Sequence, residues 1–412
     1  MSRLTSRSLA SGASLNDLIH IVITGDTSQS AQGSSYKSTL SQLQPLFLFT
    51  GGSGNCITNL YVDNVRACSN EITVFNRVQS TGSDAQNTLS FAWGSNNLAS
   101  NDYSFAFGTG TTASGFASHA EGINTIASGY GSHAEGEGTF ASGARPSHAE
   151  GYLTVASGSS SHAEGAQSIA GGSSSHAEGN NTRASGSASH AEGDSTIAGG
   201  QASHSEGYST NASGDYSHAE GYGSVSTGSF SHAQNKTTTS RGSSSHAGGN
   251  QSITDGPNSF VHGFINYVGG ESTAVLGGQY NNVLSGSTNN SGIFGGERNV
   301  ISGATSFSDP AYNSVIIGGS GNTVTYQNSS IIASENSKLT ADHSVILGGY
   351  NITGTTANTV FVPNFVLYSA YTYTPSGTTD LPGVPTGTVT WDNNYFYYKG
   401  TTGWRRISGA TW

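Results

Sequence analysis

The sequence has little of what an ordinary soluble globular protein is built from. Of 412 residues only 33% are hydrophobic and 9% are charged, with a single methionine, whereas typical soluble domains are about 45–50% apolar and about 25% charged. A conventional large core of Leu, Ile, Met and Phe is therefore excluded for a chain of this length. Low apolar content can indicate disorder, but disorder usually comes with high charge and no periodicity. Here the charge is low, 58 residues are glycine, and the periodicity is strong.

Basic residues, long apolar runs and cysteines are also scarce. Fourteen Lys and Arg stand against 25 Asp and Glu without any basic run, so we expect no nucleic-acid binding. No segment approaches the roughly 18 apolar residues of a membrane helix, and residues 1–20 lack the apolar part of a secretory signal. We therefore expect neither membrane insertion nor export by the usual route. Cys56 and Cys68 are too few for a disulfide scaffold, and the sequence leaves open whether they pair.

What the sequence does contain is an internal repeat. Ten histidines recur in one frame, separated by eight intervals of 14 residues and one of 15. They are His119, His133, His148, His162, His176, His190, His204, His218, His232 and His246. The longer interval contains Ala144–Pro146, where we expect one extra residue to bulge at a corner of the coil.

Each repeat consists of two five-residue halves. Ser118–Gly122 reads Ser-His-Ala-Glu-Gly and Thr125–Gly129 reads Thr-Ile-Ala-Ser-Gly, and both halves alternate with the period of two that is typical of strands. Each half ends in glycine, which we interpret as a turn position with backbone angles that other residues avoid. Two strands and two turns in 14 residues predict one coil of a parallel β-roll, with coils stacked at the strand spacing of about 4.8 Å.

The frame continues beyond the histidines and divides the chain. Regular coils are predicted over residues 86–268, and irregular coils with loop insertions such as Ala304–Asn313 over residues 269–362. Residues 1–85 are predicted to form a small β-containing N-terminal docking segment. Residues 363–412 are predicted to form a C-terminal β-meander tip. The strands of the tip are expected near Gly387–Trp391, Asn394–Lys399 and Gly403–Ile407.

The alternation assigns the side chains of the first strand to two faces. In Ser118–Gly122 the small residues point into a narrow roll, while His119 and Glu121 point outward. The outward position of the second strand varies from Ile126 to Arg183, whereas the outward His and Glu hardly change from coil to coil. Such identity indicates one repeated environment, which an interface between subunits supplies. We predict a trimer-interface ladder of His119, Glu121, His133, Glu135, His148, Glu150, His162, Glu164, His176, Glu178, His190, Glu192, His204, Glu206, His218, Glu220, His232 and His246.

Apolar residues replace His and Glu in the flanking coils. At the start of the ladder they form a predicted apolar trimer plug of Phe91, Trp93, Phe105 and Phe107. Aliphatic residues take the same positions near the end, so the predicted interface changes from apolar to His/Glu and back to apolar.

The ladder permits two interpretations. It can be a polar seam of interchain His–Glu hydrogen bonds and water, or it can hold metal, because three histidines around a threefold axis supply nitrogen ligands and Glu adds oxygens. We favour the seam, since equivalent metal rings at intervals of about 5 Å would stack charge. We therefore predict no metal and no cofactor. In the seam, each Glu is expected to raise the pKa of its His, and each His to lower the pKa of its Glu.

Coils of this kind resemble a known family. Ser314–Gly318 (Ser-Val-Ile-Ile-Gly) and its equivalents resemble the head domains of trimeric autotransporter adhesins, and the His-Ala-Glu-Gly version is similar to repeats in bacteriophage tail-fibre and virion-fibre proteins. The resemblance covers roughly residues 88–360. It implies an all-β, left-handed parallel β-roll, a β-solenoid that is joined as a homotrimer.

The resemblance also implies a function. It predicts a non-enzymatic virion fibre, most directly a tail fibre, made in the host cytoplasm, whose N-terminal segment binds other virion proteins of the baseplate, tail or capsid. The tip would contact a host glycan or protein through Tyr395, Tyr397, Trp404 and Arg405, unless these aromatic residues pack the tip itself. No catalytic residue is predicted, because no nucleophile elbow, P-loop or paired-carboxylate pocket stands out. A cell-surface trimeric adhesin and a structural capsid fibre without a receptor stay open as alternatives.

Overall fold

In a computed structural model the chain forms two compact parts, residues 1–74 and 75–412. The structure describes residues 18–23, 34–39, 77–79, 82–284, 288–303, 311–363, 389–391 and 395–408. These residues form strands and turns and no helix. Among them there is accordingly no helix of the length and apolarity that crossing a membrane requires. In the first part, β1 (Leu18–Ile23) and β2 (Ser34–Thr39) pair as antiparallel strands.

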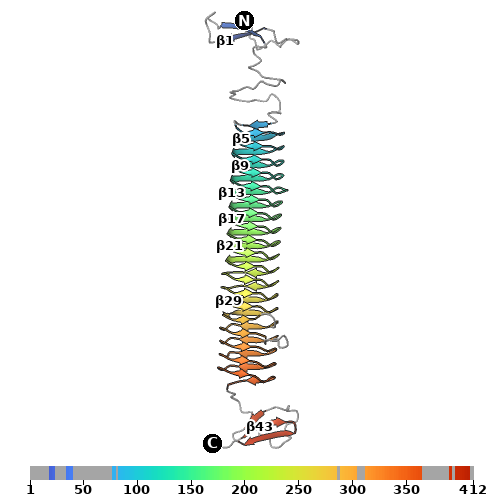
Figure 1. Cartoon of the computed structure of the whole chain (residues 1–412), viewed down its shortest axis with the longest axis vertical. Coiled ribbons are helices and arrows are strands. Elements are labelled where there is room, and N and C mark those ends of the chain that lie inside the picture. The colour runs from blue at the N-terminus through green and yellow to red at the C-terminus, as the bar shows by residue number, and fades with distance from the viewer. Residues whose placement is uncertain are drawn as a thin grey trace. The chain divides into compact units, whose positions relative to one another are not determined.

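The second part contains a parallel β-solenoid of about 19 coils (Figure 1). Its longer strands form one sheet of 20 strands, from β3 (Arg77–Gln79) to β41 (Val360–Phe361), and its shorter strands form a second sheet of 19, from β4 (Asp84–Ala85) to β40 (Thr353–Gly354). Neighbouring strands are parallel and in register at one repeat, so that Ala120 pairs with Ala134. The predicted all-β roll of 14-residue coils is thereby confirmed. Its left-handed winding and its assembly into a trimer stay predictions.

The other strands of the first sheet are β5 (Ser90–Ser95), β7 (Phe105–Thr109), β9 (His119–Ile123), β11 (His133–Glu137), β13 (His148–Tyr152), β15 (His162–Ala166), β17 (His176–Asn180), β19 (His190–Asp194), β21 (His204–Tyr208), β23 (His218–Tyr222), β25 (His232–Ala233), β27 (His246–Ala247), β29 (Phe260–Phe264), β31 (Ala274–Gln279), β33 (Gly292–Phe294), β35 (Val315–Ile317), β37 (Ser330–Ile332) and β39 (Val345–Leu347). Those of the second sheet are β6 (Leu98–Ala99), β8 (Thr112–Ala113), β10 (Ile126–Ala127), β12 (Phe140–Ala141), β14 (Val155–Ala156), β16 (Ile169–Ala170), β18 (Arg183–Ala184), β20 (Ile197–Ala198), β22 (Asn211–Ala212), β24 (Val225–Ser226), β26 (Thr239–Ser240), β28 (Ile253–Thr254), β30 (Tyr267–Val268), β32 (Asn282–Val283), β34 (Val300–Ile301), β36 (Thr323–Val324) and β38 (Lys338–Leu339).

Neither glycine of a coil leaves room for a side chain against the next coil, since a Cβ on Gly122 would lie 2.0 Å from the carbonyl oxygen of Gly136. Gly122 has a φ of +111°, as the predicted turn position demands. Gly129 does not have a positive φ; a Cβ there would lie 2.2 Å from the carbonyl oxygen of Gly143 in the next coil. The expectation of unusual backbone angles is therefore wrong for the second glycine, which is required because consecutive coils approach too closely for a side chain.

The interior of the roll is as narrow as the alternation predicts. Ala120 and Ala127 have no exposed surface, and they belong to continuous columns of buried alanine. Ser118 is buried beside them, and its hydroxyl donates a 2.7 Å hydrogen bond to the carbonyl oxygen of Gly115. In the last third of the roll the inward positions carry larger residues such as Val261 and Ile316. Each coil is thus held by its backbone ladder, with hydrogen bonds from buried serines such as Ser118, more than by apolar volume.

The 15-residue interval keeps the register of the roll. Residues 144–146 are exposed at a corner, while His133 still pairs with His148. The predicted one-residue bulge is confirmed, because the extra residue is confined to the turn. Most of the predicted insertion Ala304–Asn313 lies outside the described residues, but Gly292 on one side pairs with Val315 on the other.

The stacked coils begin before the predicted start of the roll at residue 86. β3 pairs with β5, so coil stacking begins within the predicted N-terminal segment of residues 1–85. Cys56 and Cys68 lie outside the described residues. Near the C-terminus, β42 (Val389–Trp391), β43 (Tyr395–Gly400) and β44 (Gly403–Ser408) form an antiparallel sheet in that order. The three strands expected there are confirmed.

Sequence reasoning missed a second internal column, made of asparagine. Asn266, Asn281, Asn299 and Asn322 are all buried in successive coils. The backbone N–H of Asn281 donates to Oδ1 of Asn266 at 2.9 Å, and Asn299 donates to Asn281 in the same way at 3.1 Å. The signal was an Asn at one frame position of consecutive irregular coils.

Candidate functional site

The predicted ladder lies on the outer face of the first sheet. In β9, His119 and Glu121 are half-buried on this face, while Ala120 between them is fully buried inside the roll. Each ladder residue pairs in register with its equivalent, as His119 does with His133. The structure therefore brings all the predicted ladder residues together in two parallel columns, one of imidazoles and one of carboxylates. Their burial between subunits stays a prediction.

The imidazole column is a regular stack. From His119 to His232, the ring centroids of neighbouring histidines are 4.7–4.8 Å apart and the ring planes lie within 6° of parallel. This spacing is imposed by the hydrogen-bonded strands beneath. The stack ends at His246, whose ring lies at 79° to that of His232 and stacks on Phe260.

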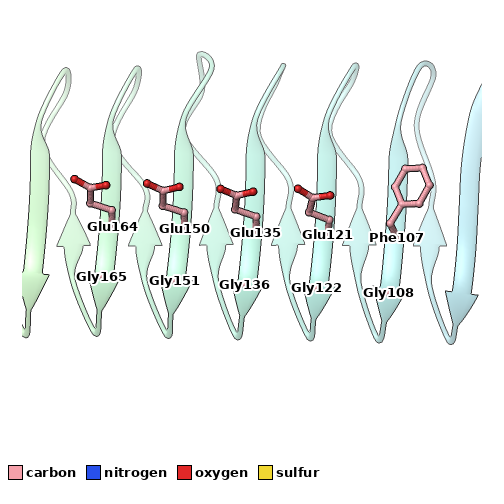
Figure 2. Close-up of a pocket in the computed structure, with 10 residues that line it drawn as sticks. All are labelled: Phe107, Gly108, Glu121, Gly122, Glu135, Gly136, Glu150, Gly151, Glu164 and Gly165. Atoms are coloured by element: carbon pink, nitrogen blue, oxygen red, sulfur yellow. The ribbon is translucent and has the colours of Figure 1, made fainter.

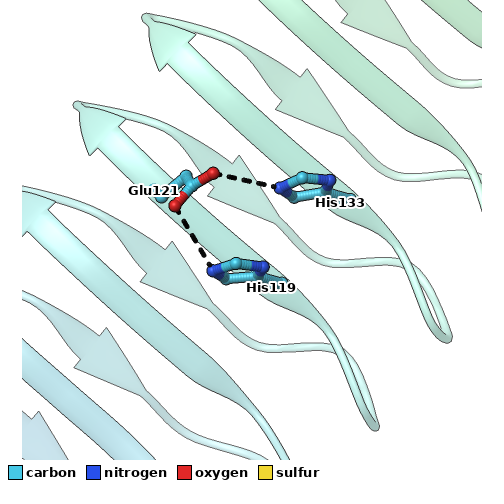
Figure 3. A group of neighbouring side chains, drawn as sticks. All are labelled: His119, Glu121 and His133. Atoms are coloured by element: carbon cyan, nitrogen blue, oxygen red, sulfur yellow. Dashed lines mark ion pairs between the residues drawn. The ribbon is translucent and has the colours of Figure 1, made fainter.

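Each carboxylate lies between two imidazoles. Glu121 places Oε2 3.7 Å from Nε2 of His119 and Oε1 3.6 Å from Nε2 of His133 (Figure 3). Corresponding separations along the ladder are mostly 3.5–3.9 Å, longer than hydrogen bonds. The exceptions are His218–Glu206 at 3.1 Å and His232–Glu220 at 3.2 Å.

Most ladder histidines consequently have a buried ring nitrogen that lacks a hydrogen bond. Among the described residues, no hydrogen-bond partner faces Nε2 of His119, His133, His148, His162, His176, His190, His204 or His246. Buried polar atoms in folded proteins are nearly always satisfied. The outer face of a single chain is therefore chemically incomplete along most of the ladder.

The glutamates act to raise the pKa values of His148 and His176, as expected, but opposing effects outweigh them and the net shift is downward. Burial of the rings, followed by the charge of neighbouring histidines, lowers the pKa of His148 and of His176. Burial and His232 lower the pKa of His246 to about 4. For these three histidines, burial together with neighbouring rings disfavours the charged imidazole more than the nearby carboxylates favour it.

The glutamates alternate instead of shifting together. Hydrogen bonding to Glu150, followed by burial, raises the pKa of Glu135 to about 7. Hydrogen bonds with neighbouring glutamates, followed by burial, likewise raise the pKa of Glu164 to about 7. The same hydrogen bonds lower the pKa of Glu150 and of Glu178. The expected lowering thus holds for Glu150 and Glu178, but its largest cause is hydrogen bonding with neighbouring glutamates and not the histidines.

The carboxylate column borders a long groove. Figure 2 shows Glu121, Glu135, Glu150 and Glu164 projecting in one row, with Phe107 continuing the row at its end. The groove here has a volume of about 720 Å³, and a further 460 Å³ continues from Glu164 toward Gly207. It is open because each Glu is followed by a glycine, which leaves the neighbouring column without side chains.

The predicted apolar plug lies on this same face. Phe105 pairs with His119 and Phe107 with Glu121, so the aromatic residues continue the two columns. The rings of Phe91 and Phe107 stack at 5.0 Å, while Trp93 is 55% exposed and Phe105 42% exposed. The structure brings the four plug residues together in a surface cluster that a single chain leaves open to solvent.

Aliphatic residues take over the Glu position beyond the ladder. Leu276 pairs with Phe294 and Phe294 with Ile317, while Ile317 and Leu347 both pair with Ile332 between them. Leu276, Phe294, Ile317 and Leu347 are 42–46% exposed. The outer face of the first sheet is therefore apolar at its start, carries His and Glu in the middle and is apolar again at its end, as predicted.

The candidate receptor residues of the tip divide into two groups. Tyr397 and Trp404 are buried, at 5% and 6% exposure, and Nζ of Lys399 lies 5.7 Å from the Trp404 ring. Both aromatic residues therefore pack the tip and do not present a binding surface. Arg405 is exposed, whereas the side chain of Tyr395 is not among those that the structure describes.

Exposed aromatic pairs at the corners of the coils were not anticipated. Rings on neighbouring coils stack at 5.0–5.3 Å in Phe116–Tyr130, Tyr208–Tyr222 and Tyr216–Phe230. The available signal was an aromatic residue at one frame position of two consecutive coils.

Some ladder residues are also close enough to share a cation. Ligand atoms of His119, Glu121 and His133 lie within 4.8 Å of one another, as do those of Glu135, His148 and Glu150. Imidazole and carboxylate are ligands that zinc and similar ions accept.

Comparison with known protein families agrees with this architecture. A family model described as the YadA head domain repeat, in two copies, matches residues 85–111, 108–132, 120–145 and 149–175. A search of curated proteins found no match. The chain therefore carries adhesin-type head repeats in the first coils of the solenoid, and the same register continues from them through the later coils.

Proposed function

We propose that this chain is the subunit of a non-enzymatic, homotrimeric virion fibre, which acts as a rigid spacer and attaches the particle to its host. The observation that carries the proposal is the outer face of the first sheet. It combines exposed aromatic and aliphatic residues at both ends with histidines whose Nε2 atoms lack partners among the described residues. A second and third copy of the chain would cover this face along its whole length.

The solenoid suits a spacer for a physical reason. Twenty strands at the usual spacing make a stack about 90 Å long. Backbone hydrogen bonds join every coil to the next, and bending the stack would break them. Contacts between three such stacks would add stiffness at each coil.

The assembly is tested by the mass of the purified full chain in solution, measured by light scattering at neutral pH with a chelator present. We expect a mass near three times 42.1 kDa. A mass of one chain would contradict the trimer and leave the ladder facing solvent.

A bacterial cell-surface trimeric adhesin is the second candidate, favoured by the match to YadA head repeats. Antibodies against the solenoid distinguish the two candidates when they are used to label purified virions and intact cells. Labelling of virions supports the fibre, and labelling of uninfected cells supports the adhesin. Host attachment is tested with the assembled protein on host cells, where an Arg405→Ala substitution is expected to weaken binding if the tip contacts the receptor.

A further inference from the structure

The spacing between imidazole and carboxylate is the feature of the ladder that a seam of hydrogen bonds does not explain. Eight coils carry both a ladder His and a ladder Glu, and we call each such pair a rung. The Nε2–Oε separations of 3.6–3.9 Å in the first rungs are too long for a hydrogen bond. Two ligands of one tetrahedral zinc ion, each bonded at 2.0–2.1 Å, are about 3.4 Å apart. The observed separations are close to that value.

The orientation of the side chains fits a shared ion as well. The buried Nε2 atoms of His119 and His133 point to the two oxygens of Glu121 (Figure 3). No hydrogen-bond partner satisfies either nitrogen within the described part of the chain. To bind one ion, the two rings must tilt toward each other from their 4.7 Å stacking distance. At the end of the column, the ring of His246 is turned by 79° from that of His232.

Charge balance determines how many ions the ladder can hold. An ion on every rung would place two positive charges at intervals of about 5 Å, which is costly. One divalent ion for every two rungs meets two carboxylates and two neutral imidazoles, so its charge is balanced. Successive ions would then be about 10 Å apart, and the eight rungs would hold four.

We propose that the ladder binds divalent transition-metal ions of the zinc class, one for every two consecutive rungs, through two imidazole nitrogens and two carboxylates. The mixed nitrogen and oxygen ligands favour Zn²⁺, Co²⁺ or Ni²⁺, whereas Ca²⁺ and Mg²⁺ prefer oxygen alone. The rungs pair as His119 to Glu135, His148 to Glu164, His176 to Glu192 and His204 to Glu220. The site lies on the face that the proposed trimer would cover, but each set of four ligands comes from one chain, so metal binding does not require the trimer.

The experiment uses the full chain without a histidine tag, stripped of metal with a chelator that is then removed. Co²⁺ is added, and bound cobalt per chain is measured by equilibrium dialysis together with the visible absorption of tetrahedral Co²⁺. We expect about four bound ions per chain with tetrahedral absorption. Binding of fewer than one ion per chain at micromolar free Co²⁺ overturns the proposal.

A matched pair of variants locates the ions. Replacing Glu150, Glu164, Glu178 and Glu192 with Gln removes the carboxylates of two sites, and bound cobalt should fall to half. The control replaces Glu271 and Glu335, which are exposed in coils beyond the ladder, with Gln, and its binding should equal that of the original chain. Equal binding by the ladder variant and the original chain overturns the proposal.

A second measurement does not depend on a variant that folds. X-ray absorption of the zinc-loaded original chain should show four nitrogen or oxygen ligands, including the scattering pattern of imidazole. A zinc shell without imidazole overturns the proposal. The oligomeric state is read separately by light scattering with chelator, so a trimer that takes up no cobalt would overturn the metal site and leave the fibre proposal standing.

Discussion

Two adjacent glycines, Gly171 and Gly172, differ in how closely other atoms approach them. A Cβ on Gly172 would lie 1.9 Å from the carbonyl oxygen of Gly186, whereas the nearest atoms to a Cβ on Gly171 are 3.9 Å away. We expect Gly172→Ala to lower the free energy of unfolding by about 1–3 kcal/mol, since overpacking forces the backbone apart. Gly171→Ala should be neutral or stabilising by about 0.4–1 kcal/mol. Thermal unfolding followed by circular dichroism tests both, and equal destabilisation would contradict the stacking argument.

Titration of the glutamate column gives a second prediction for single residues. The pKa of Glu135 and that of Glu164 are raised to about 7, from an ordinary value of 4.5. A group with a raised folded pKa contributes stability that is complete below its unfolded pKa and is lost as pH rises through the folded pKa. Replacing both with Gln should therefore raise the melting temperature relative to the original chain at pH 8 by more than at pH 5.

This comparison is made with chelator present, so that metal binding does not interfere. The matched control replaces the exposed Glu271 and Glu335 with Gln, which removes the same charge away from the ladder. No such trend between pH 5 and pH 8 is expected for the control. Parallel behaviour of the two variants would show that the carboxylate column does not share protons.

At the scale of the coil, the 14-residue repeat length sets the strand register. Residues 14 apart pair through backbone hydrogen bonds, and both sheets keep this register through the regular coils. Period-two alternation and the 14-residue repeat were sufficient to predict these strands, because both signals are local. The buried Asn column and the stacked corner aromatics were not predicted, since each depends on which side chain lies above which in the next coil.

Removing whole and half coils tests the register. Deletion of residues 175–188 removes one complete coil and would pair His162 with His190. We expect a folded protein whose melting temperature stays within a few degrees of the original, because each coil contacts chiefly its neighbours. Deletion of residues 175–181 removes half a coil. The sequence of a short strand, Arg183–Ala184, would then have to occupy a position in the sheet of longer strands. That variant should lose its cooperative thermal transition, and equal stability of the two deletions would contradict the model of stacked coils.

At the scale of the whole molecule, the prediction concerns the apolar plug. Phe105 and Phe107 continue the ladder face, and exposed aromatic clusters of this kind usually mark interfaces. Replacing both with Ser should weaken subunit association, so that the variant dissociates at a higher protein concentration in analytical ultracentrifugation. The control replaces Tyr130 and Tyr216, which are exposed at 58% and 50% in turns between the strands. Equal weakening by the control pair would argue against an interface at the plug.

The sequence by itself determined the β-roll, the faces of its strands and the residues of the ladder and plug. All of these follow from a repeat in which neighbouring residues alternate and every fourteenth residue recurs. Only the tertiary structure decided that Gly129 is required by the next coil, that the pKa values of His148 and His176 fall and that Tyr397 and Trp404 are buried. The physical reason is distance through space, because close approach, burial and charge coupling depend on residues that the fold brings together and that the sequence keeps apart.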